Sequence, residues 1–251
     1  LGLDGVISIG KANPVRTPQG WEFSLDPGGV DPVLGIRYLS EAYLKSDPDY
    51  RGRATVPAVV NIRTGCVVNN DYFRLSNYLE TAWAPFHKHG APDLYPLDLR
   101  EEIDKLNDTL YHEVNNAVYR AGFAQTQGEY EDAYDVLFNR LDILEERLAA
   151  GRYLFGDRLT DSDIRLYVTL ARFDVSYYLV FKTNRNQIAD FPNLWNYARD
   201  LYQTPGFGDT TDFDAIKRGY ELGSHAKNPY GRLAKGPDLS GWNEPHDRGN
   251  F

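Results

Sequence analysis

The sequence predicts an α+β chain, in which a mixed α/β segment precedes a longer segment built only of helices. Short β-rich runs bounded by turn residues end near residue 68. From residue 97 onward, apolar residues recur three or four positions apart, which is the spacing of amphipathic helices. The chain has 251 residues, of which 42% are hydrophobic, and this is enough for two small domains with separate cores.

Residues 1–83 are expected to form the first domain. A β-rich run at 56–62, a turn at 63–65 and a return run from Cys66 indicate a hairpin. The expected elements are a strand at 6–9, a loop at 14–29, a helix at 35–43, the hairpin at 56–68 and a helix at 71–81. The order β–α–β–β–α is that of the later part of a thioredoxin-like domain, so the first strand and helix of that fold are missing.

Residues 84–96 interrupt any regular period with three prolines and a glycine, and we expect them to form a linker. The second domain, residues 97–222, is expected to be all-helical. Its predicted helices lie at 97–118, 130–148, 160–173 and 192–202. Residues 223–251 are rich in Gly and Pro and are expected to form an irregular tail.

Composition excludes several classes of partner. The net charge of −9 opposes a broad nucleic-acid surface, which requires clustered Lys and Arg. No stretch approaches the roughly 18 consecutive apolar residues of a membrane span. Because Cys66 is the single cysteine, no internal disulfide can form, and we expect a cytoplasmic protein.

The histidines predict no metal site. His87 and His89 lie in the expected linker and have no Cys or acidic partner at ligand spacing. The sequence also contains no phosphate-binding loop and no dinucleotide fingerprint.

Two short motifs carry structural information. Val56-Pro57 opens a strand with a residue that donates no backbone hydrogen bond, as an edge strand allows. Thr160 and Asp163 have the spacing of a capping box, with Asp in place of the usual Glu, which predicts a helix N-terminus.

Several strings together resemble one family, the glutathionyl-hydroquinone reductases, which are the Xi class of the glutathione transferase superfamily. The string 156–163 (Gly-Asp-Arg-Leu-Thr-Asp-Ser-Asp) resembles the capping signature of the glutathione transferase helical domain. The other matching strings are 20–23, 47–57, 115–124, 172–174, 181–185, 188–195 and 216–220. They cover nearly the whole chain in the same order, so the resemblance implies a thioredoxin-like domain followed by an all-α glutathione transferase domain.

The resemblance implies a binding site for glutathione as co-substrate. Trp21 would pack against glutathione, and Arg53 would help to hold the tripeptide. The Val56 backbone would pair with the cysteinyl part, with Pro57 as the cis-proline that leaves this backbone accessible.

The chain departs from the family where the γ-glutamyl end would bind. The family has Glu followed by Ser there, and the matching residues are Asp71 and Tyr72. The backbone donors and dipole of the following helix would still favour a carboxylate. We therefore expect γ-glutamyl binding at these two residues in an altered form.

The resemblance also implies that three tyrosines line a hydroquinone pocket. They match Tyr119, Tyr177 and Tyr220. A phenol donates a hydrogen bond to a developing phenolate or acts as a general acid, so these residues are the catalytic candidates.

The nucleophile of the family is a Cys in a Cys-Pro-Trp string, and no such string occurs here. We expect it upstream of Leu1, because Cys66 begins a return strand and does not lie at a helix N-terminus, where thiolates are activated. The implied activity is reduction of glutathionyl-hydroquinones by thiol–disulfide exchange, carried out by a homodimer. Two alternatives stay open: a glutathione transferase or dehalogenase with a Ser or Tyr nucleophile, and a non-catalytic binding module.

Overall fold

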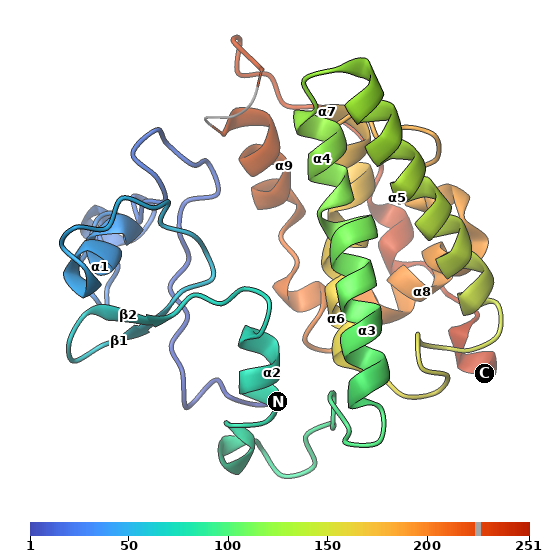
Figure 1. Cartoon of the computed structure of the whole chain (residues 1–251), viewed down its shortest axis with the longest axis horizontal. Helices are drawn as coiled ribbons and strands as arrows, with labels where there is room; N and C mark the ends of the chain where they lie inside the picture. Colours follow the sequence, from blue (N-terminus) through green and yellow to red (C-terminus); the bar gives the residue numbers. More distant parts are fainter. Residues whose placement is uncertain (224–226) are drawn as a thin grey trace. The chain divides into compact units, whose positions relative to one another are not determined.

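The computed structural model describes residues 1–223 and 227–251, so part of the expected tail, 224–226, lies outside the described residues. The chain forms two compact units (Figure 1). The first comprises Leu1–Pro92 and Arg218–Arg232, and the second comprises Asp93–Lys217 and Leu233–Phe251. The domain boundaries expected from the sequence stay a prediction. The two units are not continuous in sequence, because residues 218–232 belong to the first unit and the chain returns to the second unit at Leu233.

The first unit contains a two-stranded sheet and short helices. Its elements are η1 (Pro27–Gly29), α1 (Leu39–Ser46), β1 (Val59–Asn61), β2 (Cys66–Asn69), α2 (Leu75–Glu80) and η2 (Ala84–Phe86). Its central core cluster is Phe23, Leu39 and Tyr43.

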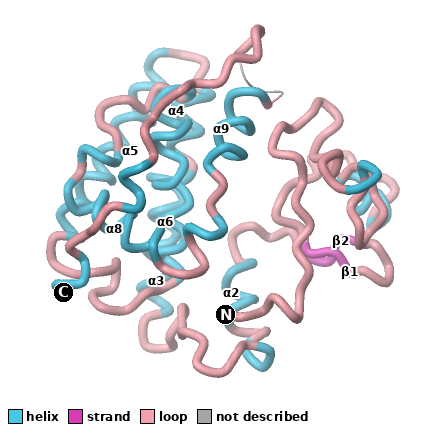
Figure 2. Tube along the Cα trace, turned by 180° about the vertical axis from the view of Figure 1, so that it is seen from behind, coloured by secondary structure: helices cyan, strands magenta, loops and turns pink. Residues whose placement is uncertain are grey.

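The predicted hairpin is confirmed. β1 and β2 are antiparallel, with Asn61 paired to Cys66, and Figure 2 shows them in magenta. The Asn61 side-chain oxygen accepts hydrogen bonds from the amides of Arg63 and Thr64 (3.0 and 3.3 Å), and this closes the turn. Gly65 completes the turn with a φ of 70°, which a residue without Cβ adopts most easily.

The strand predicted at 6–9 is wrong. The Val6 and Ile7 amides both donate to the Leu3 carbonyl (2.8 and 3.0 Å), so the backbone closes a local turn instead of pairing with a strand. Among the described residues, the sheet contains β1 and β2 alone. Ile9 is 79% exposed, and its apolar character therefore does not reflect burial in a sheet.

Helix α1 begins four residues later than predicted. The reason is local: Gly35 has a φ of 66°, outside the helical region, and the Glu41 carboxylate accepts hydrogen bonds from the amides of Arg37 and Tyr38 (2.9 and 2.8 Å). A carboxylate that satisfies these free amides fixes the helix N-terminus at Leu39.

The second unit is helical, as predicted (Figure 2). Its longer helices are α3 (Arg100–Leu110), α4 (Ala117–Phe123), α5 (Gln127–Leu148), α6 (Asp161–Arg172), α8 (Pro192–Gln203) and α9 (Phe213–Leu222), the last of which crosses into the first unit after Lys217. Its short elements are η3 (Tyr111–Asn115), η4 (Phe173–Tyr177), α7 (Tyr178–Val180), η5 (Ile188–Asp190), η6 (Gly208–Thr210), η7 (Ser240–Asn243) and η8 (Arg248–Asn250). η3 and η4 are π-helical turns that continue α3 and α6.

The predicted capping box begins α6. The amide and hydroxyl of Thr160 both donate to the Asp163 carboxylate (2.8 and 2.9 Å), and Tyr197 donates to its other oxygen (2.8 Å). Burial raises the pKa of Asp163, while these donors act in the opposite direction. The motif is structural, because every one of these bonds fixes the start of a buried helix.

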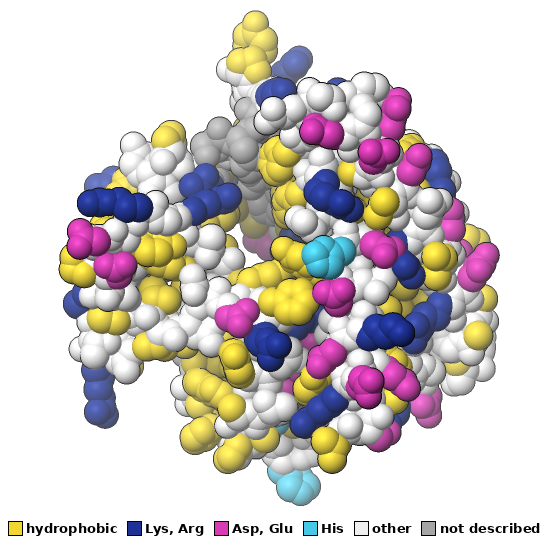
Figure 3. Space-filling model, viewed as in Figure 1, with side chains coloured by type: hydrophobic (Ala, Val, Ile, Leu, Met, Phe, Trp, Pro, Cys, Tyr) yellow, Lys and Arg dark blue, Asp and Glu magenta, His cyan; other side chains and the backbone are white. Residues whose placement is uncertain are grey.

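Charged side chains of both signs cover the helical unit. On the face in Figure 3, Lys and Arg lie among Asp and Glu over its helices. Among the described residues, no helix is long and apolar enough to cross a membrane.

Candidate functional site

Trp21 lies in a short hairpin of the first unit. Thr17 and Gly20 close this hairpin with mutual backbone bonds of 3.1 and 3.0 Å, and the Trp21 carbonyl accepts from the Leu39 amide at 2.9 Å. The Trp21 ring is half-buried against the core cluster of this unit. A ring fixed in this way keeps a part of its surface accessible for a ligand.

The segment before β1 is held by two tyrosine hydroxyls. Tyr50 donates to the Arg53 carbonyl (3.0 Å), and Tyr43 donates to the Thr55 carbonyl (2.9 Å). Val56-Pro57 has a cis peptide bond, as the resemblance implied. Val56 is 47% exposed, and among the described residues its backbone has no hydrogen-bond partner.

Asp71 and Tyr72 precede α2, and one carboxylate oxygen of Asp71 is already engaged. This oxygen accepts hydrogen bonds from the amides of Phe73 and Arg74, both at 3.1 Å. The bonds cap the turn before α2 and explain why that helix begins at Leu75 and not at 71. Tyr72 is 56% exposed.

Tyr119 and Tyr177 meet in the second unit, although 58 residues separate them. Their hydroxyl oxygens are 3.2 Å apart, and their rings meet edge to face with centroids 5.7 Å apart. Phe181 stacks on Tyr177 with an interplanar angle of 8°. Tyr177 is only 2% exposed and lies at the end of the π-helical turn η4, whereas Tyr119 lies on α4 and is half-buried.

Tyr220 lies near the end of α9, in the part that belongs to the first unit. Its neighbour Gly219 allows a close approach of α9 to the loop at Pro14, since a Cβ there would lie 3.0 Å from the Pro14 carbonyl oxygen. The structure therefore brings Tyr119 and Tyr177 together in the second unit, whereas Tyr220 belongs to the first unit, where its neighbour Gly219 lies close to Pro14. The roles of all three tyrosines stay predictions.

Cys66 is a free thiol at the start of β2. Its sulfur lies 3.4 Å from the Lys45 carbonyl oxygen, to which the thiol donates. This position on a strand lacks the helix N-terminus that activates a thiolate.

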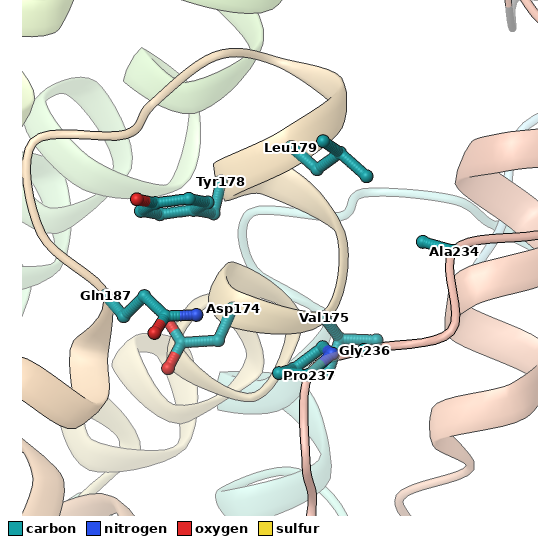
Figure 4. A pocket seen from close by; sticks show the side chains of 8 residues that line it. All are labelled: Asp174, Val175, Tyr178, Leu179, Gln187, Ala234, Gly236 and Pro237. Atoms are coloured by element: carbon teal, nitrogen blue, oxygen red, sulfur yellow. The ribbon is translucent and has the colours of Figure 1, made fainter.

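A surface pocket next to Tyr177 was not predicted from the sequence. Its volume is about 280 Å³, and it lies between the turn η4–α7 and the segment that contains Gly236 and Pro237 (Figure 4). The side chains of Asp174 and Gln187 point toward one another in it. The Asp174 carboxylate accepts from the amides of Ile188 and Ala189 (2.6 and 3.2 Å), and burial raises its pKa to about 6.

The described residues contain no cluster of three His, Cys, Asp or Glu side chains that could hold a metal ion.

Comparisons with known proteins identify the family of the chain. Residues 127–200 match the family model for the glutathione S-transferase C-terminal domain. The chain is 40% identical over 253 residues to glutathionyl-hydroquinone reductase YqjG of Escherichia coli, covering 98% of this chain and 75% of that protein. The glutathione-bound structure of YqjG has a TM-score of 0.93 at 38% identity and is matched over 100% of this chain and 82% of its own.

Two further solved structures are similar over the whole chain. A glutathione transferase from Gordonia bronchialis has a TM-score of 0.97 at 52% identity, covering 100% of this chain and 78% of its own. A Xi-class glutathione transferase from Natrialba magadii has a TM-score of 0.93 at 39% identity, with the same two coverages.

The chain has a glutathione transferase fold, in which a thioredoxin-like part precedes an all-α domain. The predicted fold class is confirmed. Within that class, the chain belongs to the glutathionyl-hydroquinone reductase family, the Xi class of glutathione transferases.

Proposed function

We propose that this protein uses glutathione to reduce glutathionyl-hydroquinones. The observation that carries the proposal is the 40% identity to a glutathionyl-hydroquinone reductase over 98% of the chain. The hydroxyl pair of Tyr119 and Tyr177 supports it, because two phenols 3.2 Å apart suit a phenolic substrate.

The reaction requires a thiolate, which we place on a cysteine upstream of Leu1. The thiolate attacks the sulfur of the conjugate, and the bond between sulfur and the aromatic carbon breaks. The bonding electron pair stays with the ring carbon, which takes up a proton as the hydroquinone leaves. A second glutathione then attacks the enzyme–glutathione disulfide and releases oxidised glutathione, so each conjugate consumes one glutathione.

The described residues contribute to binding and to proton transfer. In this proposal Trp21, Arg53 and the Val56 backbone bind glutathione, and the free oxygen of the Asp71 carboxylate faces the γ-glutamyl ammonium, with Tyr72 beside it. The hydroxyls of three tyrosines act on the hydroquinone: Tyr119, Tyr177 and Tyr220. Their hydroxyls stabilise charge that develops on the hydroquinone oxygens.

Turnover rates of two conjugates by the protein that includes the upstream residues test this proposal. We expect turnover of a glutathionyl-hydroquinone, and at least tenfold slower turnover of the same conjugate with both ring hydroxyls methylated, since the ether cannot form a phenolate. Equal rates for the two conjugates would contradict the proposed role of the ring hydroxyls. No turnover of either conjugate would contradict the proposed function.

We further propose that the protein acts in the cytoplasm as a homodimer. The single Cys66 supports a reducing compartment, and the heavy use of Tyr, with 18 residues, suits a protein interface as well as a ligand pocket.

A further inference from the structure

Phe181 lies against both members of the hydroxyl pair in the second unit. Its ring is stacked on that of Tyr177 (5.4 Å between centroids, 8° between planes) and tilted by 58° against that of Tyr119, also at 5.4 Å. The Phe123 ring meets it edge to face at 5.3 Å. These are the distances of favourable aromatic pairs. Because Phe181 is only 2% exposed and closely packed, a displacement of its ring would displace both tyrosines.

Gly122 provides the space that the Phe181 ring occupies. It lies in α4, three residues after Tyr119. A Cβ at this position would overlap with Cγ and Cδ1 of Phe181 and would lie 2.8 Å from its Cβ. Alanine is a better helix former than glycine, so the stability of α4 alone would favour a side chain here. The close approach of Phe181 explains why the residue is a glycine.

The backbone on both sides of Phe181 is also held. The Phe181 amide donates to the Tyr177 carbonyl at 3.0 Å, and the next residue, Lys182, has a φ of 59°. A residue with a Cβ adopts this left-handed conformation at a cost in free energy, so other contacts must stabilise it. One such contact is the Tyr130 hydroxyl, which donates to the Lys182 carbonyl at 2.7 Å. The Phe181 ring is therefore held against Gly122 although the backbone at Lys182 is strained.

We propose that Phe181 is a positioning residue for the reduction of glutathionyl-hydroquinones, with Gly122 as the residue that gives its ring space. This inference rests on the proposed function. The stacked contact restricts rotation of the Tyr177 ring, and the tilted contact with Tyr119 keeps the two hydroxyl oxygens 3.2 Å apart. Two hydroxyls at this separation can both donate to one phenolate oxygen, and rings that are held beforehand lose no freedom as charge develops.

Steady-state kinetics of the protein with its upstream residues test the proposal through Gly122→Ala and Phe181→Leu. The first change should displace the ring and the second should remove it. We therefore expect each to lower kcat about tenfold, while the KM for glutathione changes less than about twofold. Gly128→Ala is the matched control and should change neither value, since Gly128 also lies in a helix of the second unit and a Cβ there would meet nothing within 4 Å.

A variant without the two hydroxyls separates positioning from general packing. In Tyr119→Phe/Tyr177→Phe there is no hydroxyl pair to hold, so adding Phe181→Leu should lower the residual kcat by less than about twofold. The same loss with and without the two hydroxyls, or no loss in their presence, would overturn the positioning role. Phe181→Leu decides the question alone if Gly122→Ala does not fold.

Failure of the proposed function would look different. In that case the unsubstituted protein would not turn over a glutathionyl-hydroquinone, and this inference would be contradicted together with the function. If only the positioning role were wrong, the unsubstituted protein would turn over the conjugate and Phe181→Leu would do so equally fast.

Discussion

At the scale of single residues, the fold holds the hydroxyl of Tyr177 in one position. The residue is 2% exposed and stacked on Phe181, so its ring has little freedom, while its hydroxyl lies 3.2 Å from that of Tyr119. A hydroxyl that is already oriented loses no conformational freedom when charge develops on a substrate.

Tyr177→Phe and Tyr119→Phe should therefore each lower kcat by about tenfold to a hundredfold, with a small change in the KM for glutathione. Steady-state kinetics of the protein with its upstream residues measure both values. Tyr167→Phe is the matched control, because Tyr167 is 5% exposed in the same unit and its hydroxyl meets Thr211 at 2.8 Å. A control variant that lost as much kcat would show that the effect is structural.

Asp174 gives a prediction about pH. Its pKa in the folded protein is about 6, above the ordinary value of 3.8, because burial disfavours the charged form. The folded state therefore binds the proton more tightly. Protonated Asp174 therefore stabilises the folded state fully below pH 3.8, and this contribution to the free energy of unfolding is lost as the pH rises through 6.

Urea unfolding at pH 4 and pH 7 tests this sign with Asp174→Asn. Relative to that variant, the unsubstituted protein should lose about 2 kcal/mol of unfolding free energy between the two pH values, since one pKa unit is about 1.4 kcal/mol and the unfolded carboxyl is already partly ionised at pH 4. Asp132→Asn, at an exposed position in α5, should show no such change. An unchanged difference between the unsubstituted protein and Asp174→Asn would contradict the raised pKa.

At the scale of elements, the C-terminal segment stabilises the end of α5. Arg248 is fully buried and donates to the carbonyls of Leu148 and Arg152 (2.9 and 3.0 Å) and also to that of Gly151. Leu148 is the last residue of α5, and Gly151 and Arg152 follow it. The carbonyls at the end of a helix lack intrahelical partners and favour positive charge.

Arg248→Ala should lower the free energy of unfolding by about 3 kcal/mol, because it leaves buried carbonyls without donors. Chemical denaturation measures the change. Arg158→Ala provides the control: it removes an exposed ion pair with Asp98, for which we expect less than about 1 kcal/mol. Equal losses for the two variants would show that the Arg248 contacts contribute little.

Elements with a strong local signal could be predicted from the sequence. The hairpin has its turn residues, and α6 has Thr160 and Asp163 at capping distance. The strand at 6–9 was predicted from apolar composition alone. Apolar residues also occur in a turn such as the one closed by the Leu3 carbonyl, so composition did not distinguish the two. The π-helical turns η3 and η4 were not predicted, because a single widened turn is too short to establish a period of its own among the apolar residues.

At the scale of the whole molecule, most site residues could be placed only through resemblance. Tyr119 and Tyr177 lie far apart in the chain, and no spacing rule brings them together. Trp242 and Arg248 were assigned to an irregular tail, yet both are buried, since one anchoring side chain carries no periodic signal.

The proposed substrate joins two chemically different parts, a glutathionyl group and a hydroquinone. Its reduction therefore yields two products that can be counted separately. A conjugate that carries both parts is therefore the most direct probe.

The central measurement is product analysis after a glutathionyl-hydroquinone and excess glutathione react with the protein that includes its upstream residues. Mass spectrometry should find one free hydroquinone and one oxidised glutathione for each conjugate consumed. A conjugate that persists unchanged, or a hydroquinone released without oxidised glutathione, would contradict glutathione-dependent reduction as the function of this protein.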